Sequence, residues 1–375
     1  MIGRPLFWLY LFLQFHIFIY LTNRIGIRQH KRINEILWLL LFLAGQLIPS
    51  FFLIRAWDFT LTAWVHLNAG WKLLTSGVFL WVFTLYMDHG FWLLFRKKPV
   101  RTQVLFKRYP LTHVFPAPFS FLRLIGFENQ IYDLEVSAVE VFLLNWPKAW
   151  NGLSLVQISD LHYGHYIHDD YLKAIVAEAK KLKPDLFALT GDFISFKKDV
   201  PRMRTLLKNL RAPLGSYAVL GNHDLWADGP GVQKVLEDDG IKVLRNEAAY
   251  LKRGKEKLAI MGVDDIWLGV RNDQPILEAE AGAKILLAHQ PDHFYLAKKS
   301  GAQLQLSGHC HGGQICFPIL GPLVVPADEG RKYAGGFIRE KESTLFIHRG
   351  IGGYPPLRTY CRPQVVKLVL KSIGG

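Results

Sequence analysis

Five strand-like segments, each ending in an aspartate, an asparagine or a histidine, constrain the fold of this 375-residue chain more than any other feature. In the first, an alternating run leads into Asp160 and His162, whose side chains share one face because they are two residues apart. A single Asp-x-His pair often arises by chance, but five strand-like segments with such endings in series do not. The segments end, in chain order, at Asp160-Leu161-His162, Gly191-Asp192, Gly221-Asn222-His223-Asp224, His289 and Gly308-His309-Cys310-His311. The series predicts a site where several strand ends present ligands to metal ions.

This series resembles the motif order of the calcineurin-like metallophosphoesterases, D-x-H, G-D, G-N-H-D/E, H and G-H-x-H, over roughly residues 145–370. The resemblance implies an α/β fold in which two packed sheets form an α/β/β/α sandwich. It implies that His223 faces the substrate as a proton donor or charge stabiliser, and that Asp224 orients the imidazole. The implied metal ligands are Asp160, His162 and His311 for one cation, Asn222, His289 and His309 for the other, and Asp192 as the bridge.

The ligand types indicate which cations to expect. Imidazole, carboxylate and amide oxygen together suit two Mn²⁺ ions, with Fe or Zn²⁺ as alternatives. Two such cations polarise a phosphoryl group and supply a nucleophile at neutral pH. Cys310, at the variable position of the last motif, is expected to be a small buried residue rather than a ligand.

Three stretches beside these motifs resemble the membrane-associated bacterial branch of the family, which includes a UDP-2,3-diacylglucosamine pyrophosphatase of lipid A synthesis. They are residues 262–265, 307–315 and 348–353. The resemblance implies cleavage of that substrate to UMP and a lipid monophosphate. Five basic residues downstream of the ligands could meet additional phosphates or could be ordinary surface charge: Arg331, Lys332, Arg349, Arg358 and Arg362.

Three apolar segments in the first hundred residues are candidates for transmembrane helices: residues 5–21, 35–54 and 71–95. The first is somewhat shorter than the ~20 residues that cross a bilayer, and Asp88-His89 lie at the end of the third or form a polar site within it. No small-residue cleavage site follows the first segment, which argues against a signal peptide. We expect a membrane anchor over residues 1–98, a basic, aromatic juxtamembrane linker over 99–134 and a metallophosphoesterase domain over 135–375.

Basic residues indicate the orientation in the membrane. The loop between the first two candidate spans carries Arg24, Arg28, Lys31 and Arg32, the next loop carries only Arg55, and six Lys or Arg residues follow the third span. Three cysteines without regular spacing indicate a reducing compartment. The net charge of +14, without a nucleic-acid-binding motif, favours a membrane over a nucleic acid as partner. We therefore expect a multi-pass protein of the bacterial inner membrane whose catalytic domain faces the cytoplasm.

Strand-like and helix-like segments alternate in the catalytic domain, which indicates a mostly parallel core. Asp169 is expected to cap a helix over about 170–183, and further helices are expected over about 200–210 and 231–237. The linker over 99–134 either packs on this domain or lies in the membrane interface. The remaining nearby histidines are interpreted as loop, substrate-side or structural residues, because the five segments already supply both ligand sets: His165, His168, His293 and His348.

The leading hypothesis is hydrolysis of a phosphodiester or pyrophosphate bond in a lipid-linked substrate. A phosphodiesterase acting on another phospholipid, or on a generic phosphodiester, would carry the same motifs. A non-catalytic scaffold would be expected to have lost ligands, and all seven are present. A transporter or sensor is disfavoured because three spans with at most one polar pair offer little from which to build a pathway.

Overall fold

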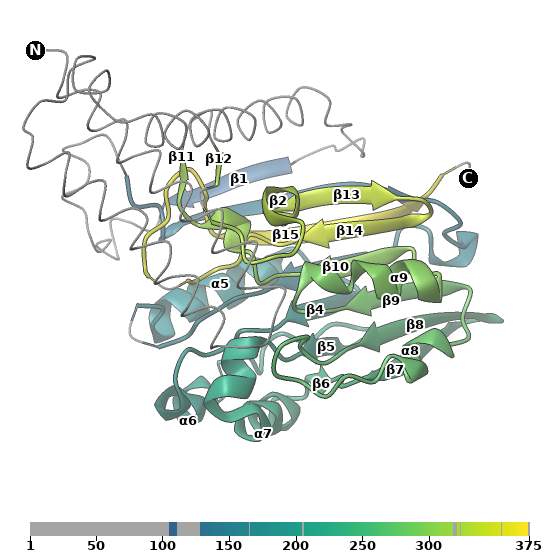
Figure 1. Cartoon of the computed structure of the whole chain (residues 1–375), viewed down its shortest axis with the longest axis horizontal. Coiled ribbons are helices and arrows are strands. Elements are labelled where there is room, and N and C mark those ends of the chain that lie inside the picture. The colour runs from purple at the N-terminus through teal and green to yellow at the C-terminus, as the bar shows by residue number, and fades with distance from the viewer. Residues whose placement is uncertain are drawn as a thin grey trace, which may run out of the picture. The chain divides into compact units, whose positions relative to one another are not determined.

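The computed structural model describes residues 105–110, 128–164, 166–204, 206–317, 321–322, 324–353 and 355–373 (Figure 1). Within these ranges, no helix has the length and apolar character needed to cross a bilayer. The three candidate spans, the Asp88-His89 pair and the loops between the spans lie outside these ranges, as does most of the linker over 99–134.

A seven-stranded mixed sheet contains the first three ligand-bearing strands, in the order β1-β2-β15-β3-β4-β5-β6. Strands β3 to β6 are parallel, as the alternation of strands and helices predicted. The C-terminal strand β15 runs antiparallel to β3 and parallel to β2. The strands are β1 Leu105–Pro110, β2 Asp133–Leu143, β3 Ser154–Ile158, β4 Leu186–Thr190, β5 Ser216–Val219, β6 Lys242–Val243 and β15 Gln364–Ser372.

A six-stranded sheet contains the other two ligand-bearing strands, in the order β13-β14-β10-β9-β8-β7. Its four central strands are parallel, and β13 and β7 pair antiparallel at the edges. The strands are β7 Glu247–Arg253, β8 Glu256–Gly262, β9 Ala283–Leu287, β10 Leu304–Ser307, β13 Gly336–Glu340 and β14 Ser343–Ile347. A separate two-stranded ribbon joins β11 Cys316–Phe317 to β12 Gly321–Pro322.

Helices accompany both sheets. Figure 1 shows α6 and α7 beside the seven-stranded sheet and α8 and α9 beside the six-stranded one. The α-helices are α5 Asp169–Lys181, α6 Val200–Met203, α7 Asn222–Asp238, α8 Gln274–Leu277 and α9 Phe294–Ser300. The described residues also form short 3₁₀ helices, η3 Lys148–Trp150, η4 Lys197–Asp199, η5 Pro291–His293, η6 His311–Gly313 and η7 Gly330–Tyr333.

Three buried apolar clusters establish the order of the layers. Successive side chains of a strand point to opposite faces, so Val156 packs towards the helices while its neighbour Leu155 packs towards the second sheet. The cluster between the sheets joins Leu155 to residues of the other sheet such as Ile260 and Leu287. A third cluster packs Met261 and further residues of the six-stranded sheet against α9. Two mixed sheets therefore lie face to face with helices on both outer faces, as the α/β/β/α prediction requires.

The helix boundaries differ from the prediction at three places. Helix α5 begins at Asp169, whose carboxylate accepts a hydrogen bond from the Tyr163 hydroxyl (2.6 Å) instead of capping the helix. Helix α6 is a single turn because the backbone becomes extended at Arg204. Helix α7 begins at Asn222, nine residues earlier than the predicted 231, with a non-helical residue at Asp228 just before Gly229-Pro230. The sequence did not predict this early start, because glycine and proline normally interrupt a helix.

Candidate dimetal site

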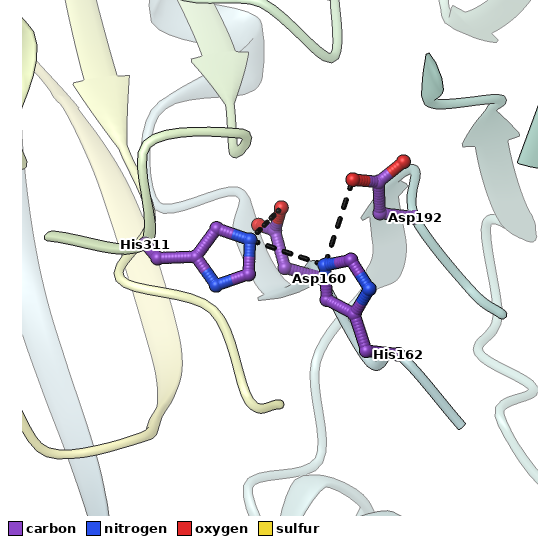
Figure 2. Close-up of side chains that lie close together, drawn as sticks. All are labelled: Asp160, His162, Asp192 and His311. Atoms are coloured by element: carbon purple, nitrogen blue, oxygen red, sulfur yellow. Dashed lines mark hydrogen bonds and ion pairs between the residues drawn. The ribbon is translucent and has the colours of Figure 1, made fainter. Parts of the chain in front are cut away.

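The first group of predicted ligands, Asp160, His162, Asp192 and His311, converges in Figure 2. His162 Nε2 lies 3.1 Å from His311 Nε2 and 3.6 Å from Asp192 Oδ2. His311 Nε2 lies 3.4 Å from Asp160 Oδ1. Each side chain offers one ligand atom, and these atoms all lie within 4.8 Å of one another.

The second group contains Asp192 again, with Asn222, His289 and His309. His289 Nε2 lies 3.2 Å from Asp192 Oδ2, 3.1 Å from Asn222 Oδ1 and 3.1 Å from His309 Nδ1. Asp192 is therefore the one residue common to both groups, which is the position that the sequence predicted for it. The structure brings all seven predicted ligands together, divided between the two groups as the motif order implied.

The five predicted strand ends meet at this site. Asp160, Asp192 and Asn222 follow parallel strands β3, β4 and β5 of one sheet, and His289 and His309 follow parallel strands β9 and β10 of the other. The carboxyl ends of parallel strands lie at one edge of a sheet, and the two stacked sheets bring their edges together here. The fold therefore explains why these residues, far apart in sequence, are neighbours.

Five of the seven predicted ligands adopt a left-handed backbone conformation. This conformation is uncommon for residues other than glycine and costs of order 1–3 kcal/mol where the surrounding structure enforces it. The residues are Asp160 (φ 53°), His162 (φ 46°), Asp192 (φ 56°), His309 (φ 68°) and His311 (φ 51°). Backbone strain concentrated in one place is characteristic of a functional site.

Two glycines allow the ligand loops to approach one another. A Cβ atom at Gly191 would lie 2.6 Å from the backbone nitrogen of Gly221 and 2.8 Å from His289 Nδ1. A Cβ atom at Gly221 would overlap the Asp192 carboxylate. Glycine before a ligand therefore permits close backbone approach at both positions.

Neighbouring groups fix the orientation of the ligand rings. His289 Nδ1 lies 2.7 Å from the carbonyl oxygen of Thr190, so it donates its proton there and leaves Nε2 facing Asp192. His162 Nδ1 lies 3.2 Å from the Ser195 hydroxyl. The backbone nitrogen of His309 donates to Asp160 Oδ1 (2.9 Å) and thereby links the two groups.

Arg358 is fully buried and holds the loops that carry His311 and Asp160 of the first group. Its guanidinium donates to the carbonyl oxygens of Gly352 (3.0 Å), Arg349 (2.9 Å) and His311 (3.4 Å). The backbone nitrogen of Gly352 in turn donates to the carbonyl oxygen of Asp160 (2.7 Å). Arg358 thus connects the loop of His311 with the loop of Asp160, a role that sequence analysis missed because no motif marks it.

Burial changes the protonation of the imidazoles. It lowers the pKa of His162 to about 3 and that of His309 to about 3, and it holds the pKa of His311 well below its usual value. His289 differs: burial lowers its pKa, but the Asp192 carboxylate outweighs burial and raises it to about 10. Burial raises the pKa of Asp160 to about 7. Three imidazoles are therefore neutral near pH 7, the form that coordinates a cation.

The contacts of Asp224 differ from the prediction that it orients His223. Asp224 is fully buried, and its carboxylate accepts four backbone N–H groups, from Asp192 (2.8 Å), Phe193 (2.8 Å), Ile194 (3.2 Å) and Gly221 (2.9 Å). The carboxylate therefore fixes the Asp192 loop, and the prediction that it orients the His223 imidazole is wrong. His223 Nδ1 is buried and has no hydrogen-bond partner among the described residues.

The residues present fit two hard or borderline divalent cations. The donor set is carboxylate, amide oxygen and imidazole, with no thiolate. Asp160 Oδ2 is buried without a hydrogen-bond partner in the part of the chain that the structure describes. Such an atom is costly unless it meets a positive charge, so the site is suited to a cation at this point.

Several other sequence predictions can be placed. Cys310 is buried, as expected. His293 and His348 are buried and belong to neither group, and His348 Nδ1 accepts the Gly350 N–H (2.9 Å). His168 immediately precedes α5, and His165 lies outside the described residues.

The basic residues expected to meet phosphates have other partners. Lys332 pairs with Glu340 (2.8 Å), Arg349 with Glu135 (2.5 Å) and Arg362 with Asp133 (2.7 Å), while Arg358 is buried on carbonyl oxygens. Arg331 lies in η7. The sequence allowed two interpretations of these residues, contacts with additional phosphates or ordinary charge. The structure does not support phosphate contacts for the four residues whose partners are known.

Comparison with known proteins agrees with this geometry. A calcineurin-like phosphoesterase family model matches residues 153–313. The chain is 33% identical over 234 residues to the uncharacterized metallophosphoesterase YkuE of Bacillus subtilis, covering 60% of this chain and 82% of the relative. It is 30% identical over 223 residues to the phosphodiesterase YaeI of Escherichia coli (57% and 80% covered). It is 27% identical over 307 residues to the UDP-2,3-diacylglucosamine pyrophosphatase LpxG of Chlamydia trachomatis (63% and 90% covered). The chain belongs to the calcineurin-like metallophosphoesterases and is a hydrolase.

Proposed function

We propose that this chain is a membrane-anchored phosphoesterase with two metal ions, which hydrolyses a phosphodiester or pyrophosphate bond of a lipid-linked substrate at the cytoplasmic face of the membrane. The leading candidate substrate is UDP-2,3-diacylglucosamine, cleaved to UMP and a lipid monophosphate. The observation that carries the proposal is the pair of ligand groups that share Asp192. A single group would suit a structural cation, whereas two groups with one common carboxylate suit phosphoryl chemistry.

The residues have distinct roles in this proposal. Asp160, His162 and His311 would hold one cation, Asn222, His289 and His309 the other, and Asp192 both. When bound, the two cations supply Lewis-acid polarisation of the phosphoryl oxygens and a nucleophile at neutral pH. Mn²⁺ is the proposed metal, with Fe or Zn²⁺ as alternatives.

His223 is proposed to protonate the leaving group or stabilise its charge. Its ring lies edge-on to His162, with 4.7 Å between the ring centroids, and its backbone nitrogen donates to Asp192 Oδ1 (2.9 Å). The first turn of α7 therefore holds the imidazole beside both ligand groups without using it as a ligand. General acid catalysis requires such a positioned side chain.

The membrane setting rests on the sequence. Three apolar segments precede the catalytic domain, and the basic residues lie in the loops that would be cytoplasmic. Cytoplasmic exposure would give access to a nucleotide-linked lipid. Fusing alkaline phosphatase after Lys107 tests the sidedness. We expect little phosphatase activity in living cells, and strong activity would place the domain outside and remove the lipid A substrate from consideration.

A second candidate is a phosphodiesterase that acts on another phospholipid or on a generic phosphodiester. The relationship to YaeI, which is named a phosphodiesterase, favours it. Purified full-length protein with Mn²⁺ should be assayed against UDP-2,3-diacylglucosamine, phospholipids and a small aryl phosphodiester. Preference for the sugar nucleotide supports the leading candidate, equal rates on the small diester support the second, and no hydrolysis with both metals bound would contradict both.

A further inference from the structure

Two tryptophans each pack against an imidazole of the site. Trp226, on α7, packs edge-on against His223, with 6.2 Å between the ring centroids. Trp267, in the loop after β8, packs edge-on against His309 at 4.6 Å. Since His223 adjoins the first ligand group and His309 belongs to the second, the two indoles flank the reacting centre from the two halves of the fold.

The loop that carries Trp267 is held in place by two buried aspartates. Asp265 Oδ1 accepts the backbone N–H groups of Trp267 and Leu268 (2.8 Å each). Asp264 pairs with Arg245 through two contacts of 2.7 Å and accepts the backbone N–H of Val270 (3.0 Å). The stretch Gly262-Val-Asp-Asp265, which the site chemistry leaves unused, therefore builds a rigid loop with apolar side chains.

Four apolar side chains, from this loop, from α7 and from the segment after Ser195, are exposed. The exposed fraction is 68% for Trp226, 53% for Leu268 and 69% for Val270. Phe196 is 43% exposed and lies next to Ser195, whose hydroxyl contacts His162. Lys197 pairs with Asp228 (3.4 Å), so the Phe196 segment lies against the turn of α7 that follows Trp226. We define these four residues as the apolar rim. Exposed apolar side chains beside a polar centre are characteristic of a binding site.

We infer that the apolar rim binds an acyl chain of the substrate, so that the enzyme selects amphiphilic phosphoesters over small ones. The inference rests on the proposed function. Leucine and valine offer aliphatic contact, and the indole of Trp226 suits the boundary between an apolar chain and a hydrated head group. Cationic side chains stand beside the rim, Lys197 next to Phe196 and Arg271 next to Val270, each paired with an aspartate (Asp228 and Asp273). Both cationic side chains are largely exposed (76% and 72%), and exposed ion pairs of this kind contribute little, so these cations can turn to an anionic head group whose acyl chain lies on the rim.

The test compares methyl 4-nitrophenyl phosphate with octyl 4-nitrophenyl phosphate, which share the reacting phosphorus and the leaving group. Burying about two of the additional methylenes gives about a tenfold gain, so the full-length wild type should show at least about a tenfold higher kcat/KM for the octyl ester. The rim variant combines Trp226→Ser with Leu268→Ser. The control combines Tyr250→Ser with Leu277→Ser, which are also exposed (48% and 42%) but lie outside the rim.

The octyl-to-methyl ratio should fall below about threefold in the rim variant and stay at the wild-type value in the control. A wild-type ratio near one, or equal ratios in the rim and control variants, would overturn the inference while leaving the proposed phosphoesterase intact. Hydrolysis of neither ester would instead count against the proposed function. If the double variant does not melt cooperatively, Val270→Ser replaces it and should lower the same ratio by a smaller factor; an unchanged ratio there would also overturn the inference.

Discussion

The two ligand groups share Asp192 but are built in different ways. All four residues of the first group have a left-handed backbone; three of them sit in loops, and His311 begins the short 3₁₀ helix η6. In the second group, Asn222 starts helix α7 and His289 follows strand β9, and neither has a positive φ. The first group depends on loops held by distant residues such as Arg358, whereas the second depends more on regular elements.

The groups also differ in charge. The first offers two carboxylates, Asp160 and Asp192, with imidazoles that burial keeps neutral. The second has one carboxylate and a histidine, His289, whose proton is stabilised by that carboxylate. Two ligand groups with similar donors are therefore expected to respond differently to mutation and to pH. The predictions below test this difference.

Asp192→Asn should have the largest effect because it removes the only residue common to both groups. A neutral amide cannot balance two cations, so we expect turnover to fall below detection while the fold, measured by circular dichroism, is retained. The matched change Asn222→Asp affects one group only and should leave measurable turnover. Activity of Asp192→Asn close to that of wild type would contradict the shared position.

His223→Ala should lower kcat by about 10²–10⁴-fold, the range typical of general acid–base catalysis. Both cations should remain bound, because His223 contributes no ligand atom to either group. Metal content measured by mass spectrometry separates the possibilities. Loss of a cation in this variant would make His223 a ligand and its proposed role wrong.

Arg358→Lys should weaken only the first group. A lysine ammonium cannot reproduce the planar fork that donates to several carbonyl oxygens at once. We expect metal affinity to fall by about 10–100-fold in one site of two, as is typical when the support of a ligand is removed. Titration with Mn²⁺ should resolve the two affinities, with Arg362→Lys as the control for a partly exposed arginine. Equal weakening of both sites would show that Arg358 acts on the fold as a whole.

Measured per pH unit, the change of metal affinity with pH should be the smallest effect. In the metal-free protein, the pKa of His289 is about 10, so this imidazole is protonated at pH 7–9 and must lose a proton before it binds a cation. Affinity of the second group should therefore rise by up to about tenfold per pH unit until about pH 10. The first group should level off above pH 7, where Asp160 has lost its proton. Calorimetry in buffers of different ionisation enthalpy measures the protons released. Identical pH profiles of metal affinity for both groups would contradict the predicted difference between them.

Most of the site could be predicted from sequence because its ligands follow buried strands at short, fixed spacings. Asp160 and His162 come together as predicted, but the expectation that the period of a strand places them on one face is wrong, because both lie beyond the end of β3 and have a left-handed backbone. The support of the ligands could not be predicted in this way. Arg358 lies almost 200 residues from Asp160 and reaches it only through a packed loop, and no local pattern reports that contact.

The fold, too, could be predicted where a local pattern determines it and not where long-range contacts do. Alternating strand and helix patterns predicted the parallel core, which β3 to β6 confirm. The start of α7 was missed because Gly229, Pro230 and Gly231 suggested a break, whereas the Asp224 carboxylate stabilises an earlier first turn by accepting the Gly221 N–H. The family resemblance implied that Asp224 orients His223, but tertiary packing gave the carboxylate to the backbone of the Asp192 loop.

The shared position of Asp192 is tested most directly by anomalous diffraction from crystals of the Mn²⁺-loaded protein. We expect two anomalous peaks. One should lie within bonding distance of Asp160, His162 and His311, the other within bonding distance of Asn222, His289 and His309, and Asp192 should contact both. A single peak, or two peaks of which Asp192 contacts only one, would contradict the shared position.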